Sequence, residues 1–102
     1  MSRTATRITL VCYDISSDKL RRKIDSCMKD FGIRLQYSIF LCRLDAEEVL
    51  RCRESIQKVL TKYGNEKVPN DSLIVFERLS ACEASCLLGS RIEHEPSDFE
   101  IF

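Results

Sequence analysis

Asp14 is the residue whose type and position could most directly do chemistry. It follows an apolar run, Ile8–Tyr13, that is too short for a helix and rich in strand-forming residues. Two serines and a basic helical pattern come after it. Folds of the α/β type tend to place chemistry just outside the ends of their strands. Asp14 is therefore our candidate catalytic residue and metal ligand, and a helix N-cap is the alternative.

A metal at Asp14 would need more than one copy of the chain. Mg²⁺ usually takes one or two protein carboxylates together with water, and Mn²⁺ suits similar oxygen ligands. A lone aspartate in a monomer would be a poor site, whereas a symmetric dimer with Asp14 near its axis would supply two carboxylates. We therefore expect Mg²⁺ or Mn²⁺ as cofactor only together with a homodimer.

Basic and aromatic side chains near this acid could contact the phosphates and bases of nucleic acid. The candidate nucleic-acid-binding residues are Tyr13, Lys19, Arg21, Arg22, Arg34 and Phe40. For the basic residues on the predicted helix, a solvated surface is the alternative. Aromatic residues in an alternating strand more often pack in a core or an interface, and we favour that interpretation for Phe40.

Other site chemistries find little support. Cys82 and Cys86 with His94 are too few for structural zinc, which takes four ligands from close pairs. A Cys/His nucleophile lacks an orienting partner, and three glycines in all leave no phosphate-binding glycine-rich loop.

Charge and cysteine content bound the class of protein. Lys and Arg number 16 and so do Asp and Glu, which argues against a strongly basic coat. The charge is uneven, because residues 1–44 hold nine basic and four acidic residues while 83–102 hold one and five. The six cysteines include no CxxC pair, and no apolar run has transmembrane length. We expect reduced, structural cysteines, a cytoplasmic protein and no membrane partner.

The hydrophobic pattern predicts one domain over 1–102, frayed at 1–6. Its core, 7–79, comprises a strand at 7–14, a helix at 17–31 stopped by Gly32, an alternating segment at 33–44, a helix to about 63 and a strand at 72–79. The segment 33–44 is one long strand, or two with a bend near Tyr37. Residues 80–98 are expected as turn or loop, with a short helix over 80–88 as the alternative, and 99–102 as a last strand.

This order is βαββαβ, an α+β ferredoxin-like sandwich whose antiparallel sheet carries both helices on one face, with an extra C-terminal strand. The other face must be covered or polar. We place Phe40, Leu44, Ile74 and Phe76 on that face, where a dimer would cover them.

Several stretches in this order resemble the CRISPR-associated protein 2 family, namely Tyr13–Ser16, Leu20–Ile24, Gln36–Phe40 and Asp71–Phe76. The resemblance covers nearly the whole chain. It implies a ferredoxin-like homodimer whose final strand pairs with the other subunit.

The resemblance also implies roles for particular residues. Asp14 matches the family's metal-binding aspartate, shared with its dimer mate, and Arg21 and Arg34 match basic positions tied to substrate contact, with Phe40 a nearby aromatic. It implies metal-dependent endonuclease activity on RNA or DNA. It further implies partnership with the CRISPR integrase in spacer acquisition.

Three alternatives remain beside the nuclease. The first is a non-catalytic scaffold that binds duplex DNA, in which Asp14 is a vestige. The second is a related toxin-type ribonuclease. The third, outside the family, is a ferredoxin-like regulatory or RNA-binding module, since fold alone does not fix function.

Overall fold

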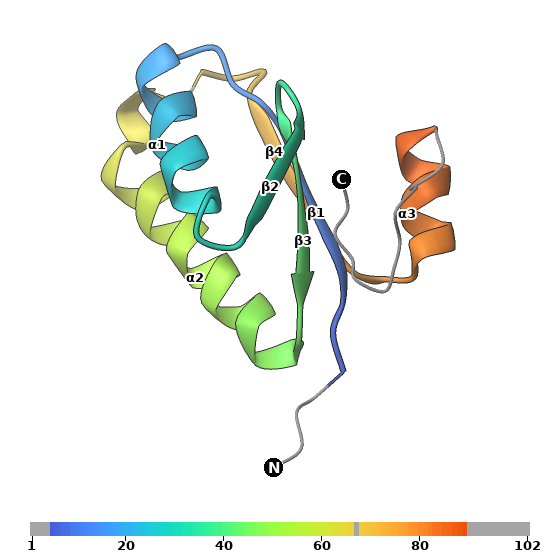
Figure 1. The fold of residues 1–102 in the computed structure, drawn as a ribbon. Coiled ribbons are helices and arrows are strands. Elements are labelled where there is room, and N and C mark those ends of the chain that lie inside the picture. The colour runs from blue at the N-terminus through green and yellow to red at the C-terminus, as the bar shows by residue number, and fades with distance from the viewer. Residues whose placement is uncertain (1–4, 67, 90–102) are drawn as a thin grey trace.

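The computed structural model describes residues 5–66 and 68–89 of the 102-residue chain. The elements follow the order β-α-β-β-α-β and then one more helix (Figure 1). They are β1 (Arg7–Asp14), α1 (Asp18–Met28), β2 (Gly32–Gln36), β3 (Ile39–Leu44), α2 (Ala46–Lys62), the 3₁₀ turn η1 (Gly64–Glu66), β4 (Ser72–Leu79) and α3 (Ala81–Leu88).

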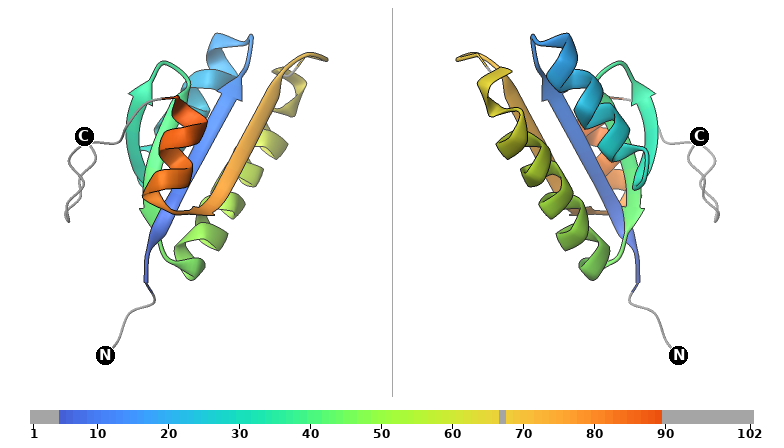
Figure 2. Two further views of the ribbon diagram at one scale, coloured as in Figure 1. Left: turned by 90° about the vertical axis from the view of Figure 1, so that its right-hand side faces the viewer. Right: turned by 90° about the vertical axis from the view of Figure 1, so that its left-hand side faces the viewer.

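The four strands form one antiparallel sheet in the order β2-β3-β1-β4. Helices α1 and α2 cover one face of this sheet, and α3 lies on the other face (Figure 2). This arrangement confirms the predicted ferredoxin-like α+β sandwich, because the order of elements and the placement of two helices on one face are as expected. None of the described helices is long and apolar enough to cross a membrane.

Alternation along β1 divides the core into two layers. Val11 and Tyr13 pack with α1 and α2, whereas Leu10 and the partly buried Cys12 belong to a smaller cluster on the opposite face. Ala84 of α3 is fully buried in that smaller cluster. Helix α3 therefore covers only part of this second face. We call the face that carries Leu10 and Cys12 the open face.

Phe40 and Leu44 do not lie on the open face, so that prediction is wrong. Both belong to the core between the sheet and its two helices, while Leu41 between them faces the smaller cluster. Phe76 packs in the smaller cluster, and Ile74 pairs directly with Cys12, so both lie on the open face as predicted. Alternation shows which residues share a face but leaves open which face that is.

The segment 33–44 proves to be two strands joined at Tyr37 and Ser38, the second of our two alternatives. Helix α1 ends at Met28, three residues before the predicted end, and Gly32 begins β2 instead of stopping the helix. A Cβ at Gly32 would lie 2.3 Å from the Leu41 backbone oxygen. Glycine is required there by the close approach of β2 to β3.

Residues 81–88 form helix α3, so the expectation of turn or loop is wrong for this part and the short-helix alternative is right. The side chains of Ser80 and Glu83 close a capping box at its start, and Gly89 ends it with a left-handed φ of 76°. The predicted strand 99–102 and the loop from residue 90 lie outside the described residues, as do residues 1–4.

Candidate metal and nucleic-acid site

Asp14 is exposed at the last position of β1, beside Ser72 of β4. Since side chains alternate along a strand, Asp14 shares the open face with Leu10 and Cys12. Among residues 5–66 and 68–89, no side chain or backbone group makes a hydrogen bond or ion pair with its carboxylate. The structure therefore presents a free carboxylate at the strand end.

The cap of helix α1 is Ser17 and not Asp14. The Ser17 hydroxyl accepts a hydrogen bond of 3.1 Å from the Leu20 amide and donates one of 3.1 Å to Glu66. This excludes the helix-cap alternative for Asp14, because the capping position is already filled.

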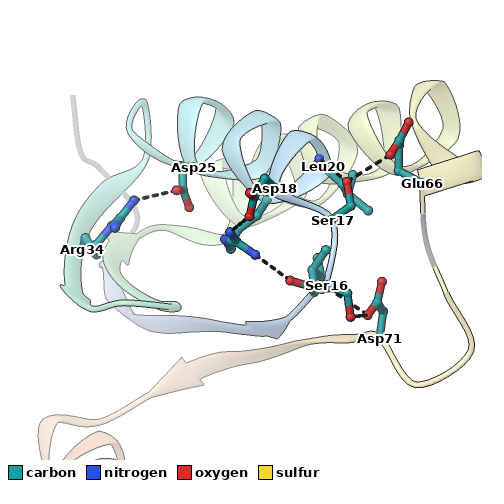
Figure 3. A network of polar contacts seen from close by, with 10 residues as sticks. Ser16, Ser17, Asp18, Leu20, Asp25, Arg34, Glu66 and Asp71 are labelled. Carbon is teal, nitrogen blue, oxygen red and sulfur yellow. Dashed lines mark hydrogen bonds and ion pairs between the residues drawn. The ribbon is translucent and has the colours of Figure 1, made fainter.

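The loop after Asp14 is held by contacts to a distant part of the chain (Figure 3). Both the amide and the hydroxyl of Ser16 donate to one carboxylate oxygen of the buried Asp71, at 3.0 and 3.1 Å. The other oxygen of Asp71 accepts from the Val68 amide at 3.0 Å. The β1–α1 loop is thus tied to the segment that leads into β4, and this fixes the backbone that carries Asp14.

Arg21 is committed to the same loop. Its guanidinium donates to the Ile15 carbonyl oxygen at 2.9 Å, forms an ion pair with Asp18 and lies 5.5 Å from the centre of the Tyr37 ring. It therefore positions the loop behind Asp14 in the free chain.

Tyr13 and Phe40 lie in the core and offer no ring to a base, contrary to the contact predicted for them. They are 3% and 1% exposed, and their rings stack with centroids 6.4 Å apart. The Tyr13 hydroxyl donates to Asp25, and burial, followed by this hydrogen bond, raises the pKa of Tyr13 above its ordinary range. Packing dictates both positions, as the core interpretation of Phe40 proposed.

Arg34 lies at the edge of the core, beside Asp25 and the Phe40 ring. Its guanidinium bonds the second Asp25 oxygen at 2.6 Å and lies 5.7 Å from the Phe40 ring centre (Figure 3). The side chain remains 40% exposed. Arg34 therefore neutralises Asp25 at the edge of the core while part of it faces solvent.

Lys19 and Arg22 are exposed on α1 and have no ion-pair partner within residues 5–66 and 68–89. The Lys19 ammonium lies 5.8 Å from the centre of the Tyr63 ring, at the end of α2. Tyr63 was not predictable as a neighbour of Lys19, because only the packing of α1 on α2 brings the two side chains together. Of the six predicted nucleic-acid-binding residues, these two are free to reach a phosphate.

The described part of the chain holds no group of three or more His, Cys, Asp or Glu side chains able to bind a metal ion. Asp14 is a hard oxygen ligand with an open environment, which suits Mg²⁺ or Mn²⁺, but it is one ligand only. The donor set fits such an ion if a second copy of the chain or a substrate phosphate supplies the rest.

Comparison with known sequences identifies the family. The sequence model described as "CRISPR associated protein Cas2" matches residues 7–84. The chain belongs to the Cas2 family. This confirms the resemblance stated from the sequence, and the match spans β1 through the first half of α3.

Curated relatives match over most of their length. "CRISPR-associated endoribonuclease Cas2 2" of Synechocystis sp. is 36% identical over 92 residues, which are 90% of this chain and 95% of that protein. "CRISPR-associated endoribonuclease Cas2 1" of Methanospirillum hungatei is 31% identical over 94 residues, covering 90% and 93%.

Solved structures share the fold. A hypothetical protein from Thermus thermophilus superposes with a TM-score of 0.59 at 29% identity, over 71% of this chain and 80% of that one. Streptococcus pyogenes Cas2 at pH 6.5 gives a TM-score of 0.54 at 22% identity, over 68% and 82%. The Cas2 fold therefore describes this chain, and at this identity the Streptococcus structure supports the fold alone.

Proposed function

We propose that this Cas2 family protein is a homodimeric, metal-dependent endonuclease of CRISPR adaptation. The observation that carries the proposal is the exposed Asp14 carboxylate, which has no partner within residues 5–66 and 68–89 and ends the central strand on the open face. The names of its relatives as Cas2 endoribonucleases support nuclease activity.

The dimer proposal rests on two exposed apolar side chains on the face of the sheet that carries Asp14. Ile74 is 50% exposed and pairs with Cys12, and Ile33 is 45% exposed and pairs with Leu41. Both partners pack in the open-face cluster, so these isoleucines lie on the same face as Asp14. A second copy that covers them would bring a second Asp14 to the site by symmetry.

Each dimer would then hold Mg²⁺ or Mn²⁺ with two Asp14 carboxylates, the remaining ligands being water or phosphate oxygen. When bound, such an ion supplies a more acidic water and stabilises charge on a phosphodiester. The chain's own contribution is positional, because Ser16, Ser17 and Arg21 hold the loop after Asp14 in place.

Lys19 and Arg22 are proposed to contact phosphates of the substrate, single-stranded RNA or duplex DNA. Arg21 and Arg34 are already paired with Asp18 and Asp25, so we propose for them a supporting role and at most a shared contact. The CRISPR integrase is the proposed protein partner, on the strength of family membership.

A non-catalytic scaffold is the second candidate, favoured by one observation. Within one chain, the described residues form no group of three or more His, Cys, Asp or Glu side chains that could hold a metal ion. In that case the protein would bind duplex DNA through its basic side chains and cut nothing.

The test is cleavage of labelled single-stranded RNA and duplex DNA by the purified protein with Mg²⁺, with Mn²⁺ or with EDTA. The proposal expects cutting with a metal ion and none with EDTA. Duplex binding that weakens with salt, without cutting under any of these conditions, would contradict the nuclease and support the scaffold.

A further inference from the structure

A basic groove runs along α1 and α2, the helices that cover one face of the sheet (Figure 2, right), with one hollow between the two helices and one beside α1. It consists of two adjoining hollows of about 390 Å³ and 420 Å³ that share Lys23 and Ser26. The cations that line them are Lys19, Arg22, Lys23, Lys58 and Lys62. We call these five residues the groove cations.

Three of the groove cations converge on one aromatic ring. The ammonium groups of Lys23, Lys62 and Lys19 lie 5.3, 5.6 and 5.8 Å from the centre of the Tyr63 ring. A hydrogen bond from Lys23, and then the charges of all three lysines, lower the pKa of Tyr63 below its ordinary value. Cation–π attraction offsets part of the repulsion among these like charges.

None of the groove cations has an ion-pair partner within residues 5–66 and 68–89. Two acids of the neighbouring elements are engaged elsewhere, since Glu66 accepts from Ser17 and Asp25 binds Tyr13 and Arg34. The chain as a whole has as many acidic as basic side chains. Five cations without ion-pair partners in one groove of a neutral chain indicate a site for an anion. On an ordinary solvated helix surface, long basic side chains would instead diverge into water.

We propose that this groove binds the phosphate backbone of a nucleic acid, through contacts separate from Asp14. The cations span more than a turn of each helix, at 19–23 and 58–62, and line two hollows in succession, which suits a row of phosphates better than one compact anion. The groove lies on the helix face and Asp14 on the open face. The inference rests on the proposed nucleic-acid ligand and not on cleavage.

The decisive variant removes the two groove cations of α2, Lys58→Gln with Lys62→Gln. The matched control is Lys29→Gln with Arg51→Gln, which removes the same charge from exposed positions near the opposite ends of the same two helices. Binding of duplex DNA and of single-stranded RNA would be measured over a range of salt concentrations in EDTA, with thermal unfolding as a check on folding.

The groove variant should bind duplex at least about tenfold more weakly at low salt, and its log–log salt slope should fall by about 2, one for each phosphate contact. The control should change the slope by less than half as much. Equal effects in the two variants would overturn the proposal, because net charge alone would then explain them. An unchanged slope in the groove variant would do the same.

Two further arms keep the result unambiguous. If the groove variant loses binding of ATP or inorganic phosphate but keeps nucleic-acid binding, the ligand is a small phosphate compound and the backbone proposal is wrong. If the glutamine variant unfolds, Lys62→Gln alone is measured, with an expected slope change of about 1. Asp14→Asn should bind nucleic acid with the same salt slope as the wild type, although its cleavage should be lost. This difference separates the groove proposal from the nuclease proposal.

Discussion

Ser17 is the helix cap, and Asp14 is left as the candidate functional carboxylate. The spacing of the two residues did not by itself decide between these roles. Ser17 caps α1 and also holds Glu66, which leaves the Asp14 carboxylate without a structural task in the described residues. An exposed acid with no structural task at the end of a central strand is a stronger functional candidate than an acid that caps a helix. The loop after Asp14 is held by Glu66 and Asp71, which are distant from it in the sequence. No local sequence pattern indicates these contacts.

Burial separates four of the six cysteines into two inert and two reactive thiols, while Cys12 and Cys27 are half-buried. Cys42 and Cys52 are buried, and burial raises their pKa to about 12 and about 11. At pH 8 they carry almost no thiolate, the reactive form. Cys82 and Cys86 are exposed on α3.

We therefore predict that a thiol reagent at pH 8 labels Cys82 and Cys86 within minutes and Cys42 and Cys52 only after denaturation. Mass spectrometry of peptides after timed labelling measures this. Raising the pH toward 11 should speed the labelling of Cys52 before that of Cys42, since the thiol with the lower pKa ionises first. Fast labelling of Cys42 in the native protein at pH 8 would contradict the packing described here.

At the scale of elements, β2 approaches β3 closely at Gly32. A Cβ at Gly32 would meet the Leu41 oxygen at 2.3 Å and the Cys42 sulfur at 2.6 Å. Gly32→Ala should therefore lower the free energy of unfolding by about 1–3 kcal/mol, the usual cost of overpacking. Urea denaturation measures the change.

Gly64→Ala is the matched control, because nothing lies within 4 Å of a Cβ placed there. It should leave the free energy of unfolding within about 0.5 kcal/mol of the wild type. Equal losses in the two variants would mean that the β2–β3 approach is looser than the structure shows.

Strand and helix positions were predictable where hydrophobic periodicity was long. β1 and β4 match their predicted bounds, and α2 begins with a capping box between Asp45 and Glu48. The faces of β3 were not predictable, because alternation is symmetric until the neighbouring strands fix the register.

The irregularity in β4 had no sequence signal. Phe76 and Leu79 both pack in the open-face cluster although they are three residues apart. Arg78 takes a positive φ of 58°, and the register opposite β1 shifts between Ile8 and Leu10. This bulge returns the Leu79 side chain to the open face. Residue preferences would not predict a left-handed backbone conformation at an arginine.

At the scale of the molecule, the open face decides whether the proposed dimer forms. Ile74→Glu would place a charge in the proposed interface and should convert the protein to a monomer, because an unpaired buried charge costs several kcal/mol. Light scattering coupled to size-exclusion chromatography measures the mass.

The control is Leu50→Glu, which adds the same charge at an apolar side chain that is 57% exposed on α2, in the helix layer. It should leave the dimer intact. A monomeric wild type, or a dimer that survives Ile74→Glu, would place the interface elsewhere and leave Asp14 without its proposed mate.

The central claim is that Asp14 supplies the metal site for phosphodiester cleavage, and Asp14→Asn tests it most directly. The initial rate of Mg²⁺-dependent cleavage should fall more than about 100-fold, since loss of even an outer-shell partner of a metal costs 10- to 100-fold. Asp30→Asn, at another exposed carboxylate, should cut like the wild type. Cleavage by Asp14→Asn at the wild-type rate would contradict the account.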